Sequence, residues 1–228
     1  MNPVFGSVSI NLAAGFSILS IILLSLYIYN GDYRLFLSGR RMAIVVSFLV
    51  IIATIILVDE LISSNFDIDY VAHHTSLETP GIYKFSALWA GQSGSLLFWL
   101  FILSIFSLIT IYQNRNRYYK MMPWILVVIL VVQLFFLILT NFITNPFEPT
   151  RADFEVVNGL GLNPLLQNLT MAIHPPILYL GFVGFTIPFA FAFAALMTNE
   201  SGSLWIRSIR RWSLVTWLSL SCVITVSY

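Results

Sequence analysis

Charged residues are scarce in this sequence, and their scarcity argues against a soluble globular protein. Only 9% of the 228 residues are charged, whereas soluble domains carry roughly 25%. The hydrophobic fraction is 58% and the mean hydropathy is +0.88, which is typical of an integral membrane protein. The net charge is +1 and there is no dense basic segment, so nothing in the charge pattern indicates nucleic-acid binding.

Cysteine is almost absent as well. Cys222 stands alone, which excludes an internal disulfide, a CxxC redox pair and a cysteine-rich zinc site. The sequence also lacks a short internal repeat, a phosphate-binding loop, a recognisable catalytic triad and an HExxH zinc motif. The opening residues, MNPVFGSVSINLAAG, have no basic segment of the kind that begins a signal peptide, so we expect them to enter the first membrane span.

Long apolar segments dominate what is present. A helix needs about 20 apolar residues to cross a bilayer. About six segments approach that length, at residues 8–29, 42–64, 86–112, 121–143, 170–198 and 213–228. The sequence therefore predicts an all-α, polytopic membrane protein with residues 1–228 in a single membrane domain. The last segment is short, so we expect either a fragment or a split protein whose fold another chain continues.

The charged residues are distributed unevenly between the connections. Nine of the eleven basic residues lie in three short connections, 30–41, 114–120 and 199–212. The two long connections, 65–85 and 144–169, hold only two basic residues against six acidic ones. Because basic loops stay in the cytoplasm, we expect the N-terminus and the two long loops to lie on the outer face.

One histidine interrupts the fifth apolar segment, in the stretch MAIHPPILYLGF (171–182). Pro175 and Pro176 lack backbone N–H groups and disfavour helical angles at His174, so we expect a kinked backbone near the outer interface. A neutral imidazole presented there is a suitable axial ligand for haem iron. The residues alone allow another interpretation, in which His174 only donates a hydrogen bond to a carbonyl group or a lipid headgroup.

The stretch YKFSALWAGQSGSLLFWL (83–100) carries small residues between two tryptophans, Trp89 and Trp99. Such a surface admits a neighbouring helix or a flat ligand, and ordinary helix packing is the interpretation that the residues favour. Next, GLGLNPLLQN (159–168) is typical of a short segment lying on the membrane surface. It could equally be a plug between helices.

Three further features have less specific interpretations. We expect His73 and His74 to be solvated in an acidic loop. We also expect Asp59 and Glu60 to be solvated at the interface, although these two carboxylates could instead bind a cation or meet Lys84. The basic segment GSLWIRSIRRW (202–212) is typical of an amphipathic helix that contacts anionic lipid at the inner surface.

Two of these stretches resemble signatures of the CcmF family. WAGQSGSLLFW (89–99), with the preceding YVAHHTSLETPGIYKFSAL, is similar to the family's third-span signature. GLGLNPLLQNLTMAIHPPILYLGFVGF (159–185) resembles the next signature, and the spacing of the two also agrees with the family. The resemblance covers essentially the whole chain, weakly at its start.

The resemblance implies a role in cytochrome c maturation at the outer face of a bacterial or mitochondrial inner membrane. CcmF proteins take a b-type haem in transit from the chaperone CcmE and join its vinyl groups to the two thiols of an apocytochrome c CxxCH motif. A CcmH-type thiol protein is a further expected partner. In this family the histidine of the HPP run is an outer-face axial ligand of the haem iron, which implies His174. The implied neighbourhood of the haem comprises Trp89, Gly91, Gln92, Gly94, Ser95, Pro175, Pro176 and Tyr179.

The chain also departs from the family pattern. The tryptophan-rich motif, the second outer ligand and the histidine pair for a resident haem are not in this sequence. The resemblance therefore implies the N-terminal part of a haem lyase, which needs the downstream portion with the tryptophan-rich motif and is inactive alone. Three alternatives remain open: a haem or small-molecule transport subunit, an assembly scaffold that binds no haem, and a relative that serves a variant haem-attachment motif.

Overall fold

The computed structural model describes residues 3–115, 117–150, 156–200, 202 and 204–226. Over these residues the chain is helical and has no β-strand, apart from one isolated bridge between Ile68 and Pro149. The prediction of an all-α polytopic membrane protein is confirmed. The elements in chain order are α1 (Pro3–Asn30), α2 (Tyr33–Ser63), α3 (Asp69–His74), α4 (Gly81–Ser86), η1 (Ala87–Trp89), α5 (Gln92–Gln113), α6 (Met122–Phe142), η2 (Pro164–Leu166), α7 (Leu169–Gly184), α8 (Thr186–Thr198) and α9 (Leu204–Val226).

Five helical segments in the described part of the chain are long and apolar enough to cross a membrane. They are α1, α2, α5, α6 and the continuous run of α7 and α8 from Leu169 to Thr198. Each coincides with one of the first five predicted segments. Helix α2 begins at Tyr33, well before the predicted start at residue 42, because Asp32 caps it by accepting a hydrogen bond from the Arg34 amide.

The segment after α8 differs from the prediction. Residues 204–212 do not form a separate surface helix, because α9 runs without interruption from Leu204 to Val226. The first turns of α9 therefore carry the three arginines of this segment, and its remaining turns correspond to the sixth predicted apolar segment. Thr216 of α9 is fully buried, so this helix packs on the bundle rather than lying alone on its surface.

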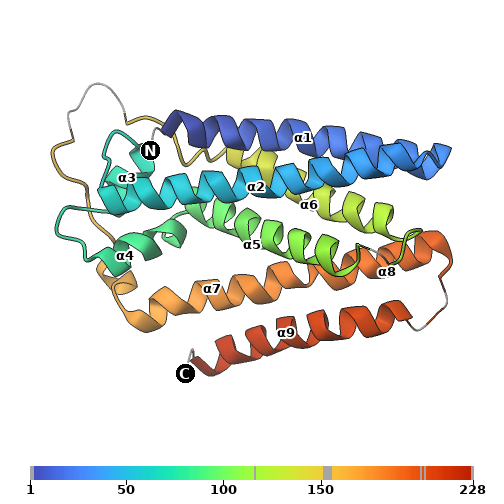
Figure 1. Cartoon of the computed structure of the whole chain (residues 1–228). Coiled ribbons are helices and arrows are strands. Elements are labelled where there is room, and N and C mark those ends of the chain that lie inside the picture. Colours follow the sequence, from blue (N-terminus) through green and yellow to red (C-terminus); the bar gives the residue numbers. More distant parts are fainter. Residues whose placement is uncertain (1–2, 116, 151–155, 201, 203, 227–228) are drawn as a thin grey trace.

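The long helices lie side by side, and the bundle has two different ends (Figure 1). The loop end contains α3, α4, η1 and η2, and here α1 begins and α9 ends. At the opposite, basic end α1 gives way to α2, α5 to α6 and α8 to α9, and the helix ends and turns there carry arginines such as Arg34, Arg115 and Arg207. Helix α1 packs on α2 and α6, α5 packs on α2, α6 and α7, and α7 packs on α9.

Glycines bring two of the long helices into close contact. A methyl group on Gly181 would overlap Leu220 of α9, and one on Gly184 would overlap the Thr216 side chain. These residues are three apart on α7 and their partners are four apart on α9, so the two helices run antiparallel. Small residues at such positions let helix backbones approach closely in a membrane.

We expect Gly184→Ala to lower the free energy of unfolding by about 1–3 kcal/mol, because the added methyl group has no space beside Thr216. Thermal unfolding in detergent micelles measures this. Gly15→Ala is the matched control, since nothing lies within 4 Å of a methyl group at that position of α1. Equal stability of the two variants would contradict the close packing of α7 on α9.

Candidate functional site

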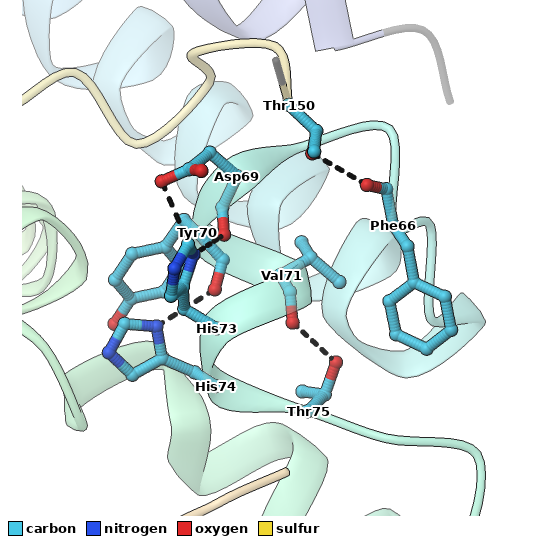
Figure 2. Close-up of polar contacts among 8 residues, drawn as sticks. All are labelled: Phe66, Asp69, Tyr70, Val71, His73, His74, Thr75 and Thr150. Carbon is cyan, nitrogen blue, oxygen red and sulfur yellow. Dashed lines mark hydrogen bonds and ion pairs between the residues drawn. The ribbon is translucent and has the colours of Figure 1, made fainter. Parts of the chain in front are cut away.

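The two long loops are joined to each other at the loop end. The backbone N–H of Asp69 donates to the Glu148 carbonyl (3.0 Å), and that of Thr150 donates to the Asp67 carbonyl (2.8 Å). The Thr150 hydroxyl also donates to the Phe66 carbonyl at 2.6 Å (Figure 2). These bonds hold α3 in place from its N-terminal side.

A second set of bonds joins the loops on the other side of α3. The Leu160 amide donates to the Ala72 carbonyl (2.8 Å), and the Gly161 amide donates to the Thr75 carbonyl (3.1 Å). The Asn158 side chain receives the Leu77 amide and donates to the Glu78 carboxylate, which lowers the pKa of Glu78. Segments that lie about 80 residues apart in sequence thus form one framework around α3.

Tyr70 connects this framework to the start of α5. Its side chain is only 6% exposed, and its hydroxyl lies 2.8 Å from the Ala87 carbonyl oxygen and 3.2 Å from that of Leu88. The same hydroxyl accepts a hydrogen bond from the Gly91 amide at 3.1 Å. Burial raises the pKa of Tyr70, so the phenol keeps its proton and remains a donor. The sequence interpretation did not single out this residue.

Gly91 and Gly94 of the WAGQSGS motif allow α3 to pack closely against the start of α5. A methyl group on Gly91 would overlap the His74 imidazole, and one on Gly94 would overlap the Tyr70 hydroxyl and the Leu88 carbonyl. Ser95 joins the start of α5 to η1, because its hydroxyl donates to the Trp89 carbonyl at 3.1 Å. Helix α3 therefore accounts for both glycines by packing, which is the interpretation that the residues alone favoured.

The adjacent histidines of α3 have different environments. His73 is exposed, as expected, and its ring lies 3.4 Å from the Asp69 carboxylate. The expectation was wrong for His74, whose ring stacks on Tyr70 with 4.2 Å between centroids (Figure 2). Its Nδ1–H donates to the Tyr70 carbonyl (2.8 Å), so the neutral ring presents its unprotonated Nε2 toward Gly91. Burial lowers the pKa of His74.

Helix α2 ends beside this framework. Glu60 is only 2% exposed, which contradicts the expectation of a solvated carboxylate, and its Oε2 accepts a hydrogen bond from the Asn65 side chain at 2.8 Å. The chain turns back at Ser64, and this brings Asn65 onto Glu60. Lys84 Nζ donates to the Ser64 hydroxyl at 2.6 Å. Asp59 is half-buried.

Aromatic side chains link α5 to α7. Trp89 packs on Phe98, and Tyr179 of α7 lies 5.8 Å from both Phe98 and Trp99, measured between ring centroids. Trp99 also stacks on Phe136 of α6 at 4.6 Å. The side chain of Gln92, in contrast, is exposed at the start of α5. Tyr179 thus holds α7 against the helix that begins at the WAGQSGS motif.

Pro175 and Pro176, at which the sequence predicts a kinked backbone, lie inside helix α7. Helix α7 continues through His174, Pro175 and Pro176, so His174 has helical geometry. The two prolines provide no N–H for the carbonyls of Met171 and Ala172, four residues earlier, but the bundle supports the helix on other faces. Pro176 lines an apolar cavity of about 180 Å³ between α5 and α7.

His174 is half-buried on a face of α7 that does not meet α5. It lies seven residues before Gly181, and two turns of helix bring these residues to one face. Gly181 contacts Leu220, so this face is directed toward α9. Pro176 and Tyr179, which contact α5, lie on roughly the opposite side. The antiparallel register set by Gly181 and Gly184 places His174 near the end of α9.

A metal cluster is not part of this arrangement. The described residues contain no group of three or more His, Cys, Asp or Glu side chains that could hold a metal ion. His174 is separated along the chain from His73 and His74, both of which lie on α3.

These features define a polytopic α-helical membrane protein whose histidines and long loops gather at one end of the bundle. The chain belongs to the cytochrome c assembly protein family, whose model matches residues 89–226. The matched region begins at Trp89 and contains both motifs on which the predicted resemblance to CcmF rests. A solved structure of the cytochrome c heme lyase CcmF has a TM-score of 0.84 and 27% identity, covering 98% of this chain and 35% of that one.

Several relatives have similar levels of identity. CcmF of Escherichia coli strain K12 is 32% identical over 225 residues, which cover 97% of this chain and 34% of that protein. CycK of Rhizobium meliloti is 34% identical over 224 residues, covering 97% and 32% respectively. NrfE of Haemophilus influenzae is 37% identical over 157 residues, covering 69% and 24%. All three are cytochrome c-type biogenesis proteins, and this chain spans about a third of their length or less.

We expect Tyr70→Phe to lower the free energy of unfolding by about 1–3 kcal/mol, because the half-buried Gly91 amide loses its acceptor and the Ala87 carbonyl loses its donor. Thermal unfolding in detergent measures the change. Tyr29→Phe is the control, since Tyr29 is 90% exposed and its replacement should change stability by less than about 0.5 kcal/mol. A loss as large in Tyr29→Phe would contradict this role of Tyr70.

His74 gives the stability a pH dependence. The pKa of His74 in the folded protein is below its unfolded value of about 6.5. As the pH falls below about 6.5, His74 is therefore protonated in the unfolded chain before it is protonated in the folded protein, and this favours unfolding. The contribution of His74 to stability is therefore complete above about pH 6.5 and is lost as the pH falls toward the folded-state pKa. We expect His74→Gln to flatten this decline in urea unfolding between pH 7 and pH 5. His73→Gln should keep it, and parallel profiles for the two variants would contradict the assignment.

Proposed function

We propose that this chain forms the N-terminal part of a CcmF-type haem lyase and that His174 supplies one axial ligand to the haem in transit. The position of His174 carries the proposal. This half-buried imidazole lies on the α7 face directed toward α9, near the start of α7. Membership of the cytochrome c assembly family and the likeness to a solved CcmF lyase support the same function.

The second axial ligand comes from another part of the lyase. In the part of the chain that the structure describes, the other two histidines are on α3, where His74 is stacked on Tyr70 and His73 is paired with Asp69. Neither shares an element with His174. The matched relatives are about three times as long as this chain, which supports a site completed by the portion with the tryptophan-rich motif. The chain alone is then inactive.

The aromatic and glycine-rich neighbourhood has a positioning role in this proposal. Trp89, Gly91, Gly94 and Ser95 shape the start of α5, and Tyr179 packs α7 against that helix. Because these contacts lie on the side of α7 away from His174, they set the depth and rotation of the imidazole instead of enclosing the haem. Gln92 is exposed beside them, and Pro175 and Pro176 shape α7 directly after the ligand.

The reaction is the addition of two thiols to two vinyl groups. Each cysteine S–H of the apocytochrome c CxxCH motif adds across one C=C bond, so that sulfur bonds to one carbon and hydrogen to the other. The chaperone CcmE delivers the haem, and a CcmH-type protein presents the apocytochrome thiols. The uneven distribution of basic residues supports placing this chemistry at the periplasmic or intermembrane face.

His174→Ala tests the ligand in complexes with CcmE and the tryptophan-rich portion of the lyase. We expect haem occupancy, measured by visible absorption, to fall about tenfold or more, since even residues that only support a ligand affect metal affinity by about 10–100-fold. His73→Ala is the control and should keep its haem.

Copurification of the partners separates this proposal from the alternatives. Loss of haem in His174→Ala with an intact complex supports the ligand. Unchanged haem in that variant contradicts it, and loss of the complex as a whole would indicate a scaffold instead.

A further inference from the structure

A second feature lies at the basic end of the bundle, opposite the histidines. A cavity of about 900 Å³ opens there between α5, the turn that follows it, α8 and α9. This volume is within the range of about 300–1,000 Å³ that is usual for ligand sites. The residues discussed for haem handling do not line it.

Four arginines surround the cavity and come from two separate elements. Arg115 and Arg117 lie on the turn after α5, and Arg207 and Arg211 lie one helical turn apart on α9. All four are exposed, and among the described residues no carboxylate forms an ion pair with any of them. The described residues that line the cavity include no Asp or Glu. Such a cluster has a strong positive potential that favours an anion.

The turn is tied to α9, so the arginines are held together. The hydroxyls of Tyr118 and Ser208 lie 2.8 Å apart, and the Tyr118 ring packs against Phe191 of α8. The Arg115 guanidinium lies 5.2 Å from the centre of the Tyr112 ring, which restricts its position. The cavity is thus a feature of the packed bundle.

The remainder of the lining is apolar. Phe106 and Trp212 meet edge to face with 5.1 Å between ring centroids, and Ile109 and Val215 extend the surface along α5 and α9. Val215 is 57% exposed, on a helix that packs on the membrane bundle. The cavity therefore combines a cationic rim with an apolar wall, which matches a phosphate headgroup carrying acyl chains.

We propose that this cavity binds the headgroup of an anionic phospholipid, with its phosphate among the four arginines and its acyl chains along Phe106, Trp212 and Val215. A zwitterionic headgroup fits less well, because its ammonium group would lie among guanidinium groups and the described lining residues offer it no carboxylate. Free phosphate would use the rim alone and leave the apolar wall without a role.

Native mass spectrometry of the chain in a non-ionic detergent tests this proposal. The probes are phosphatidylglycerol and phosphatidylethanolamine with identical acyl chains, each with and without excess inorganic phosphate. We expect phosphatidylglycerol to bind at least about tenfold more tightly than phosphatidylethanolamine and to remain bound in the presence of phosphate. Equal binding of the two lipids, or no retained lipid, would overturn the proposal. Displacement by phosphate would indicate a soluble anion instead.

Paired variants locate the site. Arg207→Gln with Arg211→Gln should weaken phosphatidylglycerol binding by about tenfold or more. Arg34→Gln with Arg41→Gln removes the same charge from exposed positions at the same end but away from the cavity, and should leave binding within about twofold. Equal losses in both pairs would overturn the proposal.

A third pair, Arg207→Lys with Arg211→Lys, keeps the charge that orients the helices. We expect it to lose less affinity than the glutamine pair, and its melting temperature shows that the fold is intact. A lysine pair that binds as weakly as the glutamine pair while remaining folded would contradict a phosphate contact at these two positions.

Discussion

The contact of α7 with α9 is the constraint on which the candidate site depends. Gly181 and Gly184 let α7 and α9 pack so closely that a methyl group would not fit between them. This close packing sets the rotation of α7 about its axis. This rotation turns His174 toward α9 and turns Tyr179 toward α5. If α7 could rotate about its axis, the direction of the His174 side chain would not be fixed. The close packing of α7 on α9 prevents this rotation and so fixes the direction.

The loop end has its own internal order, independent of the membrane. Backbone hydrogen bonds between the two long loops enclose α3, and Tyr70 transmits the position of α3 to the first turn of α5. The tyrosine hydroxyl is well suited to this role because it can donate to a carbonyl group and accept from an amide at the same time. The hydrogen bonds of the Tyr70 hydroxyl satisfy backbone groups that would otherwise bond to water where the chain turns before α5.

Much of the fold could be predicted from the sequence, because the length of an apolar run is enough to identify a membrane-spanning helix. The environments of single residues were harder to predict. His73 and His74 look alike in sequence, and only the helical geometry of residues 69–74 places the second ring on Tyr70, four residues earlier. Glu60 is buried, and the turn at Ser64 brings Asn65 back onto its carboxylate, a contact that the apolar pattern of α2 does not signal. The helix through Pro175 and Pro176 opposes local preference and depends on packing that the sequence does not reveal.

The proline pair has a mechanical consequence. Two successive residues of α7 provide no N–H, so the helix lacks two of its ladder hydrogen bonds next to His174, whereas Gly181 and Gly184 clamp its lower half to α9. Bending stiffness is therefore unequal along α7, low at the imidazole and high below it. The half of α7 that carries His174 can therefore tilt relative to the half that is packed on α9.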